Sequence, residues 1–265
     1  MLFHSTAFAV FFIIVFILYI KLPHKLQNRM LLIASYIFYG AWEWKYLALL
    51  FISTLTDYFC GLGVEKSEDS LKKRFVYLSV FINLTLLGIF KYYGFFAENF
   101  QSLMASFGVE THPYFLNIAL PVGISFYTFQ SISYTVDVYR GKLKACNNFL
   151  DFSLYVSFFP QLVAGPIERG TRLLPQILNA RKITKENIIK GLYCIFWGLF
   201  LKVVIADNMA NLVDPIYDID KSPNGILTLL ATYSFAIQIY CDFSGYSLIA
   251  IGLALLMGIE LMENF

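Results

Sequence analysis

The chain has 265 residues, of which 58% are hydrophobic and 14% charged, and its formal net charge is +2. Ordinary soluble domains carry about 25% charged residues, so this composition excludes a typical soluble domain and indicates a membrane protein. We therefore expect the lipid bilayer, and no nucleic acid, as a partner.

Apolar segments recur along the whole chain. In chain order they are Phe3–Ile20, Met30–Ala41, Tyr46–Val64, Phe75–Phe96, Tyr114–Val138, Phe152–Ile167, Ile188–Ala206, Ile226–Cys241 and Ser247–Ile259. Several are shorter than the roughly 20 residues that a perpendicular helix needs to cross a bilayer. The pattern predicts an all-α polytopic membrane protein, a bundle of about eight transmembrane helices in a single integral membrane domain over residues 1–265.

The first apolar segment, Phe3–Ile20, is predicted to be a retained transmembrane helix. Its basic residues Lys21, Lys25 and Arg29 follow the apolar run, whereas a signal peptide carries its positive charge before that run. The next segment is interrupted by Gly40 and by the cluster at 42–45.

The segment around residues 114–138 is too polar for a simple lipid anchor. It has no Asp, Glu, Lys or Arg between Tyr114 and Val136, so it is long enough to cross a bilayer. In a helical projection one face carries Ser125, Thr128, Ser131 and Thr135, and another carries Gln130, Ser133 and Asp137. Because neither polar face suits hydrocarbon, we expect this helix inside a bundle or beside a wet cavity.

Two prolines break the apolar segment Phe152–Ile167, which is predicted to be a re-entrant or half-crossing element. The following stretch, Arg169–Ile188, has leucines and an isoleucine among basic residues. It is read either as an amphipathic helix on the cytoplasmic surface or as a solvated basic connector. Within residues 158–169, Gln161 and the ion-pair-capable Glu168 and Arg169 follow the proline-broken run.

The basic residues are concentrated in four loops. Of the 20 Lys and Arg residues, 16 fall within residues 21–29, 65–74, 139–150 and 165–190. These loops share one side if the helices alternate and Phe152–Ile167 does not cross. The positive-inside rule then places them in the cytoplasm and the N-terminus outside.

A third polar stretch spans residues 233–247, where Asp242 lies between two apolar segments. A carboxylate there needs a partner or water, because burying it alone costs several kcal/mol. The four cysteines show no metal-binding or disulfide spacing, and no P-loop, GxSxG, HExxH or dinucleotide motif is present. The histidines His4, His24 and His112 lie near the N-terminus or in loops, so none is expected to act as a general base.

Three strings together resemble the membrane-bound O-acyltransferase family: ALPVGISFYTFQSISYTVDVYRG (119–141), FFPQLVAGPIERG (158–170) and YCDFSGYSLIAIGLALLMGIEL (240–261). LLIASYIFYGAWEW (31–44) gives weaker support. The similarity is strongest to the bacterial branch that acetylates alginate and other extracytoplasmic polysaccharides. The teichoic-acid D-alanyl transfer proteins form a more distant branch.

This resemblance implies O-acyl transfer across the plasma membrane. A cytoplasmic acyl donor, either acetyl-CoA or a carried acyl group, is the substrate, and no bound cofactor is expected. The acceptor is a polysaccharide hydroxyl or an extracytoplasmic relay protein. The substrate-tunnel candidates are Ser125, Gln130, Asp137, Gln161, Gln238, Asp242 and Ser244.

Two departures from the family pattern bear on activity. The family's histidine-bearing region follows the DFSGYS string, and the present sequence ends at Phe265, so we expect an N-terminal half that is inactive alone and has no catalytic residue. Leu248 stands where the family usually has an acid. The alternative functions are a transporter or channel subunit, which would commonly show inverted repeats, and a catalytically dead membrane scaffold.

Overall fold

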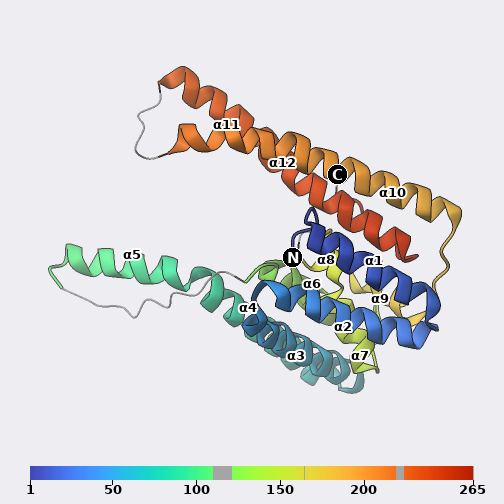
Figure 1. Cartoon of the computed structure of the whole chain (residues 1–265). Coiled ribbons are helices and arrows are strands. Elements are labelled where there is room, and N and C mark those ends of the chain that lie inside the picture. Colours follow the sequence, from blue (N-terminus) through green and yellow to red (C-terminus); the bar gives the residue numbers. More distant parts are fainter. Residues whose placement is uncertain (110–120, 164, 219–223, 265) are drawn as a thin grey trace.

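The computed structural model describes residues 1–109, 121–163, 165–218 and 224–264, and within these ranges the regular structure is entirely helical (Figure 1). In chain order the elements are α1 (Thr6–Lys21), α2 (His24–Glu43), the 3-10 turn η1 (Trp44–Tyr46), α3 (Leu47–Lys66), α4 (Asp69–Leu87), the π-helix η2 (Gly88–Tyr92), α5 (Tyr93–Ser106), α6 (Ile124–Tyr139), α7 (Phe149–Ser157), α8 (Phe159–Leu162), α9 (Gly170–Leu178), α10 (Lys185–Leu199), the π-helix η3 (Phe200–Ala206), α11 (Asp207–Tyr217) and α12 (Gly225–Leu256). The predicted all-α class is thereby confirmed.

Four helical stretches in the described residues are long and apolar enough to cross a membrane, and α1 is a shorter apolar helix. The stretches are His24–Lys66, Asp69–Ser106, Lys185–Tyr217 and Gly225–Leu256. The chain is therefore a multi-pass membrane protein. The predicted number of about eight spans is not confirmed, because several segments that the sequence separates are continuous with their neighbours in the structure.

The clearest such case is α12, a single helix of 32 residues where the sequence predicted two segments, Ile226–Cys241 and Ser247–Ile259. The helix continues through Gly245. An added Cβ on Gly245 would lie 2.8 Å from the carbonyl oxygen of Gly198. The glycine thus provides a close contact with α10 rather than a turn. From Ser244 onward most residues of α12 are buried, whereas its N-terminal half is largely exposed.

The polar helix α6 begins later than predicted. Residues 114–120 of the predicted segment lie outside the described residues, and the helix starts at Ile124 after Gly123. Gly123 has φ +76°, and a Cβ on it would lie 2.4 Å from the carbonyl oxygen of Leu162. Glycine is therefore required at this start for two reasons: the left-handed backbone conformation and the contact with α8.

The proline-broken segment is interrupted as predicted, at Phe158, between α7 and α8. Its large side chains, Phe152, Tyr155, Phe158 and Phe159, are at most 1% exposed. Irregular backbone at membrane depth is tolerated only under such a protein cover. Whether the segment is re-entrant in a bilayer stays a prediction.

The expected amphipathic helix over Arg169–Ile188 is shorter than predicted. Helix α9 ends at Leu178, and α10 begins at Lys185 behind the Thr184 N-cap. Leu173, Leu174 and Ile177 are at most 1% exposed. The apolar face of α9 therefore packs into the protein core, whereas Thr171 and Arg172 on its other face are exposed. Whether α9 lies at the cytoplasmic surface stays a prediction.

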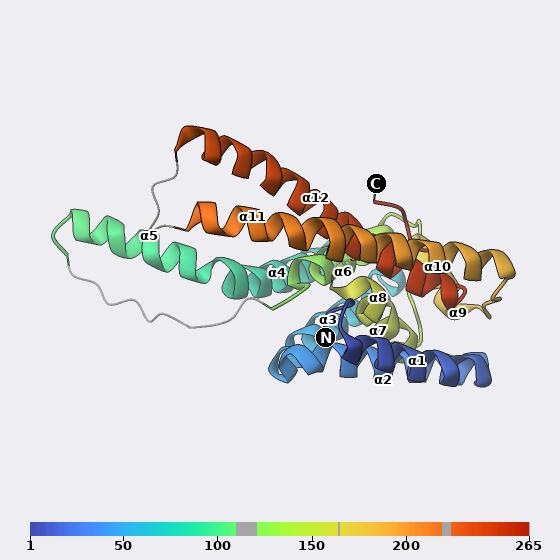
Figure 2. The same cartoon turned by 45° about the horizontal axis from the view of Figure 1, so that its top comes forward.

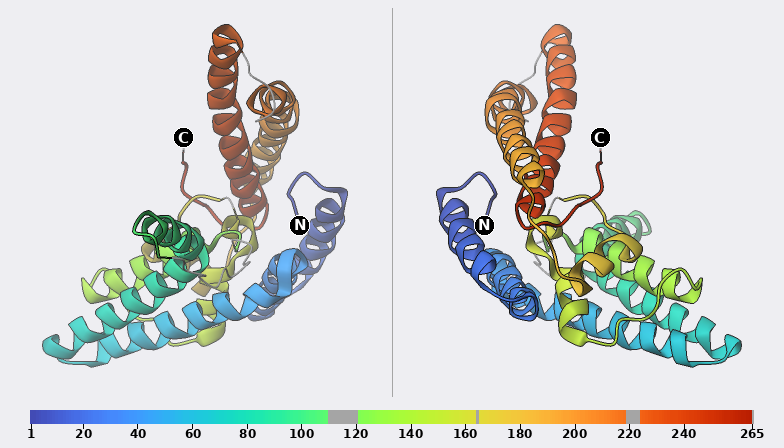
Figure 3. Two further views of the ribbon diagram at one scale, coloured as in Figure 1. Left: turned by 90° about the vertical axis from the view of Figure 1, so that its left-hand side faces the viewer. Right: turned by 90° about the vertical axis from the view of Figure 1, so that its right-hand side faces the viewer.

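The helices form a central bundle with two projecting arms. Helix α12 lies alongside α10 and α11 as one arm, and α5 extends from α4 as the other (Figures 1 and 2). The end-on views place the α10–α12 arm and the α3–α4 pair on opposite sides of α7–α9 (Figure 3).

Three of the four basic loops meet at one end of the bundle. The His24 ring lies 3.2 Å from the carbonyl oxygen of Leu178, and Asn28 Nδ2 donates to Asp151 Oδ1 at 2.9 Å. In the loop at 139–150, the carbonyl oxygen of Asn147 accepts a hydrogen bond from the hydroxyl of Tyr58 in α3 at 2.9 Å. The loops at 21–29, 139–150 and 165–190 thus share one end, and residues of all three line one pocket there. Whether this end lies in the cytoplasm, together with the loop at 65–74, stays a prediction.

Candidate functional site

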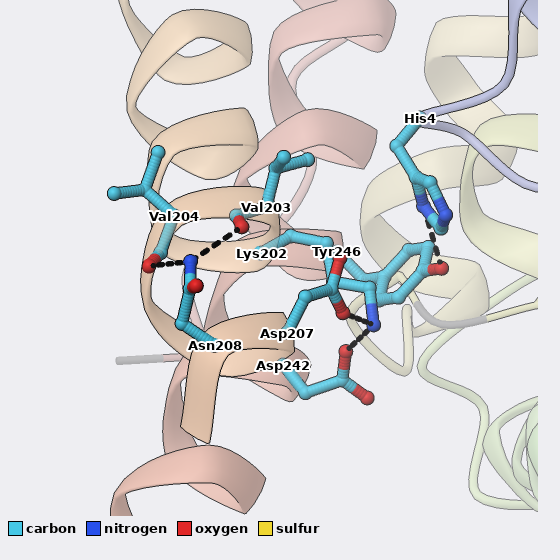
Figure 4. A network of polar contacts seen from close by, with 8 residues as sticks. All are labelled: His4, Lys202, Val203, Val204, Asp207, Asn208, Asp242 and Tyr246. Atoms are coloured by element: carbon cyan, nitrogen blue, oxygen red, sulfur yellow. Dashed lines mark hydrogen bonds and ion pairs between the residues drawn. The ribbon is translucent and has the colours of Figure 1, made fainter. Parts of the chain in front are cut away.

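A charged cluster lies where α12 crosses the long helix made of α10, η3 and α11 (Figure 4). Lys202 Nζ is 2.5 Å from Asp242 Oδ1 and 2.9 Å from Asp207 Oδ1, and the lysine side chain is only 15% exposed. Lys202 belongs to the π-helix η3, in which each N–H bonds to the carbonyl five residues back. This wider turn brings Lys202 and Asp207, five residues apart, onto one face.

Two aromatic groups continue this cluster towards the N-terminus. The Lys202 ammonium lies 5.4 Å from the centre of the Tyr246 ring, one helical turn after Asp242. The Tyr246 hydroxyl is 3.1 Å from His4 Nδ1. We call these five residues, His4, Lys202, Asp207, Asp242 and Tyr246, the Lys202 cluster.

An apolar cavity of about 360 Å³ adjoins the Lys202 cluster. Asp242 and Tyr246 form its polar part. The apolar part comes from Met1, Leu2, Phe3, Phe38, Val163, Ile239 and Phe243. We call it the Phe38 cavity. Its composition suits an uncharged group with one polar end.

Two predicted site residues, Gln130 and Gln161, meet in the bundle core. Gln161 Nε2 donates to Gln130 Oε1 at 2.9 Å, and Gln130 Nε2 donates to the carbonyl oxygen of Tyr155 at 2.8 Å. The two side chains belong to residues only 2% and 3% exposed. This geometry is that of a brace between α6, α7 and α8, because the amides bond within the protein.

The other predicted residues are dispersed. Ser125 accepts a hydrogen bond from Lys91 Nζ at 3.4 Å, whereas Asp137 is buried near the opposite end of α6. Gln238 lies one turn before Asp242, and its Oε1 atom is buried without a hydrogen-bond partner in the described part of the chain. Ser244 lines a separate cavity of about 420 Å³. The seven candidates therefore do not converge on one site here, and their role in a tunnel stays a prediction.

A buried carboxylate that the sequence reasoning missed, Asp57, joins α3, α4 and α6. It is 0% exposed and accepts hydrogen bonds from Ser79 Oγ, from Asn83 Nδ2 at 2.7 Å and from Thr135 Oγ1 at 3.0 Å. Thr135 lies on one of the two predicted polar faces of α6. That face is thus buried against protein, as expected.

Lys202 was missed for the same reason as Asp57. The charge analysis concentrated on loops, whereas Lys202 and Asp57 are single charges within apolar segments. Charges at such depth are rare and usually paired, and this signal could have identified both residues. Their partners could not be identified, because they lie on other helices.

Glu168 and Arg169, the ion-pair-capable residues, have different surroundings in the structure. Glu168 is 0% exposed and accepts a hydrogen bond from the backbone N–H of Met262, whereas Arg169 is exposed. Burial raises the pKa of the Glu168 carboxyl above its ordinary value, against the opposing effects of the Met262 N–H and the nearby Arg172. Glu168 therefore fixes the segment after α12 to the segment before α9.

Comparison with known proteins identifies the relatives of this chain. The model of the MBOAT, membrane-bound O-acyltransferase family matches residues 37–265. A probable alginate O-acetylase of Pseudomonas putida is 40% identical over 100% of the chain and 55% of its own length. A peptidoglycan O-acetyltransferase of Helicobacter pylori is 37% identical over 89% of the chain and 49% of its own length.

A teichoic acid D-alanyltransferase of Bacillus subtilis is a more distant relative, 30% identical over 56% of the chain and 38% of its own length. The chain spans about half the length of the first two relatives. The matched region includes every residue of the Lys202 cluster except His4. The chain belongs to the membrane-bound O-acyltransferase family.

Proposed function

We propose that this chain is part of an enzyme that transfers acetyl groups from a cytoplasmic donor towards hydroxyls of an extracytoplasmic polysaccharide such as alginate. The donor is acetyl-CoA or a carried acyl group, and the acceptor is the polymer itself or a protein that relays the acyl group. The relatives named as O-acetyltransferases support this class of reaction. Because the chain spans about half their length, the proposal concerns the whole protein.

The observation that carries the proposal is the Lys202 cluster on the wall of the Phe38 cavity. One ammonium faces the carboxylates of Asp207 and Asp242, so the cluster has no positive charge in excess to attract a phosphate. The cavity beside it is mostly apolar. These two properties suit a small uncharged acyl group, held between apolar side chains with its carbonyl end towards Tyr246.

The reaction also defines what the rest of the protein must supply. The acceptor oxygen attacks the acyl carbonyl carbon, the bond to the donor breaks, and a base removes the proton of the hydroxyl. His4, whose side chain is exposed, is the one histidine in the Lys202 cluster, and His24, at the first residue of α2, lines no part of the Phe38 cavity. We therefore propose that residues 1–265 alone do not catalyse transfer.

We also propose a location in the plasma membrane with the N-terminus outside. The contacts among the loops at 21–29, 139–150 and 165–190 support a common side for these basic loops. The positive-inside rule assigns that side to the cytoplasm.

The function is tested by deleting the encoding gene and measuring ester-linked acetate on the secreted polysaccharide and on peptidoglycan separately. Both polymers are measured because the relatives act, by name, on alginate and on peptidoglycan. We expect a loss of acetate from the secreted polysaccharide, restored by the full-length gene. Unchanged acetate on both polymers would favour a channel subunit or an inactive scaffold instead.

The Lys202 cluster is tested by Asp242→Asn in the full-length protein, which preserves shape and removes one charge. Loss of one carboxylate weakens the hold on the Lys202 ammonium, so we expect slower acetyl transfer and a lower melting temperature. Asp214→Asn, the same change at an exposed position of α11, is the matched control. If Asp242→Asn acetylates at the wild-type rate and melts at the wild-type temperature, the assignment of Asp242 to the site is wrong.

A further inference from the structure

A second polar site, distant from the Lys202 cluster, lies at the end of the bundle where the basic loops meet. It is a pocket of about 230 Å³ between the start of α2, the start of α7 and the end of α9. His24, Lys25 and Arg29 line it from α2, and Asn148 and Asp151 line it from α7. We call it the basic pocket.

Two basic side chains of this pocket, Lys25 and Arg29, stand against one acid, Asp151. Asp151 Oδ1 accepts a hydrogen bond from Asn28 Nδ2 at 2.9 Å. Lys25 and Arg29 are exposed and form no ion pair within the described ranges. The pocket therefore presents a surplus of positive charge.

A third cation lies directly behind the pocket. Arg181 Nη2 donates to Asn28 Oδ1 and is 3.4 Å from His24 Nδ1. The Nε and Nη1 atoms of Arg181 are buried and have no hydrogen-bond partner among the residues the structure describes. The Arg181 guanidinium lies 5.4 Å from the centre of the Tyr19 ring, and Asp151 is the nearby acid whose charge acts on it. Since Asp151 is one acid against Lys25, Arg29 and Arg181, a net positive charge remains, and Arg181 places part of it in a region less screened than open solvent.

The surroundings of the pocket are apolar and exposed. Leu150 and Leu178, which line it, are 41% and 45% exposed, and Leu26 beside it is 43% exposed. A soluble anion gains nothing from these leucines, whereas a lipid places its phosphate in the polar part and its acyl chains along the apolar part. Basic pockets of this kind on the cytoplasmic side of transmembrane helices suit anionic headgroups.

We propose that the basic pocket binds the phosphate of an anionic phospholipid in the adjoining leaflet. Lys25 and Arg29 contact the phosphate oxygens, and Arg181 contributes its field from behind. The site thereby ties α2, α7 and α9 together at the membrane surface. This proposal is independent of the acyl-transfer function.

The test uses the full-length protein in nanodiscs of phosphatidylcholine, with or without phosphatidylglycerol, followed by thermal unfolding and native mass spectrometry. We expect phosphatidylglycerol to raise the melting temperature and to remain bound. The double variant Lys25→Gln, Arg29→Gln should melt as wild type in phosphatidylcholine. It should lose the stabilisation and bind phosphatidylglycerol more weakly by about fivefold per charge removed.

A matched control removes the same charge outside the pocket. Lys73→Gln, Arg74→Gln changes the beginning of α4, which does not line the pocket, and both side chains are exposed. Equal effects of the two double variants would show general surface attraction and overturn the proposal. Stabilisation by inorganic phosphate in phosphatidylcholine, without further gain from phosphatidylglycerol, would overturn the assignment to a lipid.

Discussion

At the scale of single residues, the molecule places a few charged groups inside an apolar framework and gives each a specific partner. Asp57 is held by three hydrogen-bond donors on two other helices, and Lys202 by two carboxylates. Glu168 is different, because its Oε2 atom is buried without a partner among the described residues. We therefore expect the contribution of Glu168 to the stability of the folded protein to depend on pH.

Because burial raises the pKa of Glu168 in the folded protein, the folded state binds a proton more readily than the unfolded state. The resulting stability is fully present below the unfolded pKa, near 4.5, and is lost as pH rises through the folded pKa. Glu168→Gln keeps an acceptor for the Met262 N–H and cannot ionise. We expect its melting temperature to vary less with pH above 4.5 and to equal or exceed that of wild type at neutral pH.

Melting curves of the full-length protein and the variant across this pH range check the expectation. Glu65→Gln, the same change at an exposed position of α3, controls for a general charge effect. If Glu168→Gln melts below wild type at neutral pH with an unchanged pH slope, Glu168 is stabilised as a carboxylate and our interpretation is wrong.

At the scale of elements, glycine pairs set the distance between α10 and α12. Cβ atoms built on Gly191 and Gly198 would lie 2.9 and 2.6 Å from the carbonyl oxygens of Gly252 and Gly245. The two glycines of each helix are seven residues apart, so they repeat along one face of the antiparallel pair. Small residues allow such close backbone approach between helices in membranes. Lys202 follows Gly198 by one turn, so this contact also determines how near Lys202 comes to Asp242.

We therefore expect Gly198→Ala to push α10 away from α12. The methyl group meets backbone, which cannot move as a flexible side chain can, and such overpacking typically costs about 1–3 kcal/mol. We expect a lower melting temperature and, through the displaced Lys202, slower acetyl transfer by the full-length protein. Gly94→Ala in α5, where an added Cβ meets nothing within 4 Å, is the control and should be neutral or stabilising. Equal melting of both variants would contradict the role of the glycine contact.

At the scale of the whole molecule, the basic loops that meet and the two projecting arms lie at opposite ends of the bundle (Figure 1). The proposed topology places residue 69 in the cytoplasm and residue 105 outside. Both positions are exposed, and the four native cysteines are buried, so single cysteines introduced at these sites can be labelled against a low background.

We expect Ala105→Cys to react with a membrane-impermeant maleimide in intact cells, and Asp69→Cys to react only after the membrane is opened. Each labelled position serves as the control for the other, because a leaky membrane would expose both. If residue 105 reacts only from the cytoplasmic side, the topology is wrong.

The sequence by itself determined the class of the protein, the location of most helices and the family. Composition and hydrophobic segments are local properties, and the polar strings around Gln130, Gln161 and Asp242 are specific enough in combination to indicate the family. The sequence also indicated that one polar face of α6 is buried, because helical periodicity places Thr128, Ser131 and Thr135 together.

The tertiary structure alone decided which polar groups meet. Gln130 pairs with Gln161 across 31 residues of sequence, and Asp242 pairs with Lys202 across a helix crossing. Neither partner follows from local pattern, because it depends on how closely two helices approach. The same reason explains the wrong boundaries: Gly245 has the local properties of a turn, and only its contact with Gly198 shows that α12 continues through it as one helix.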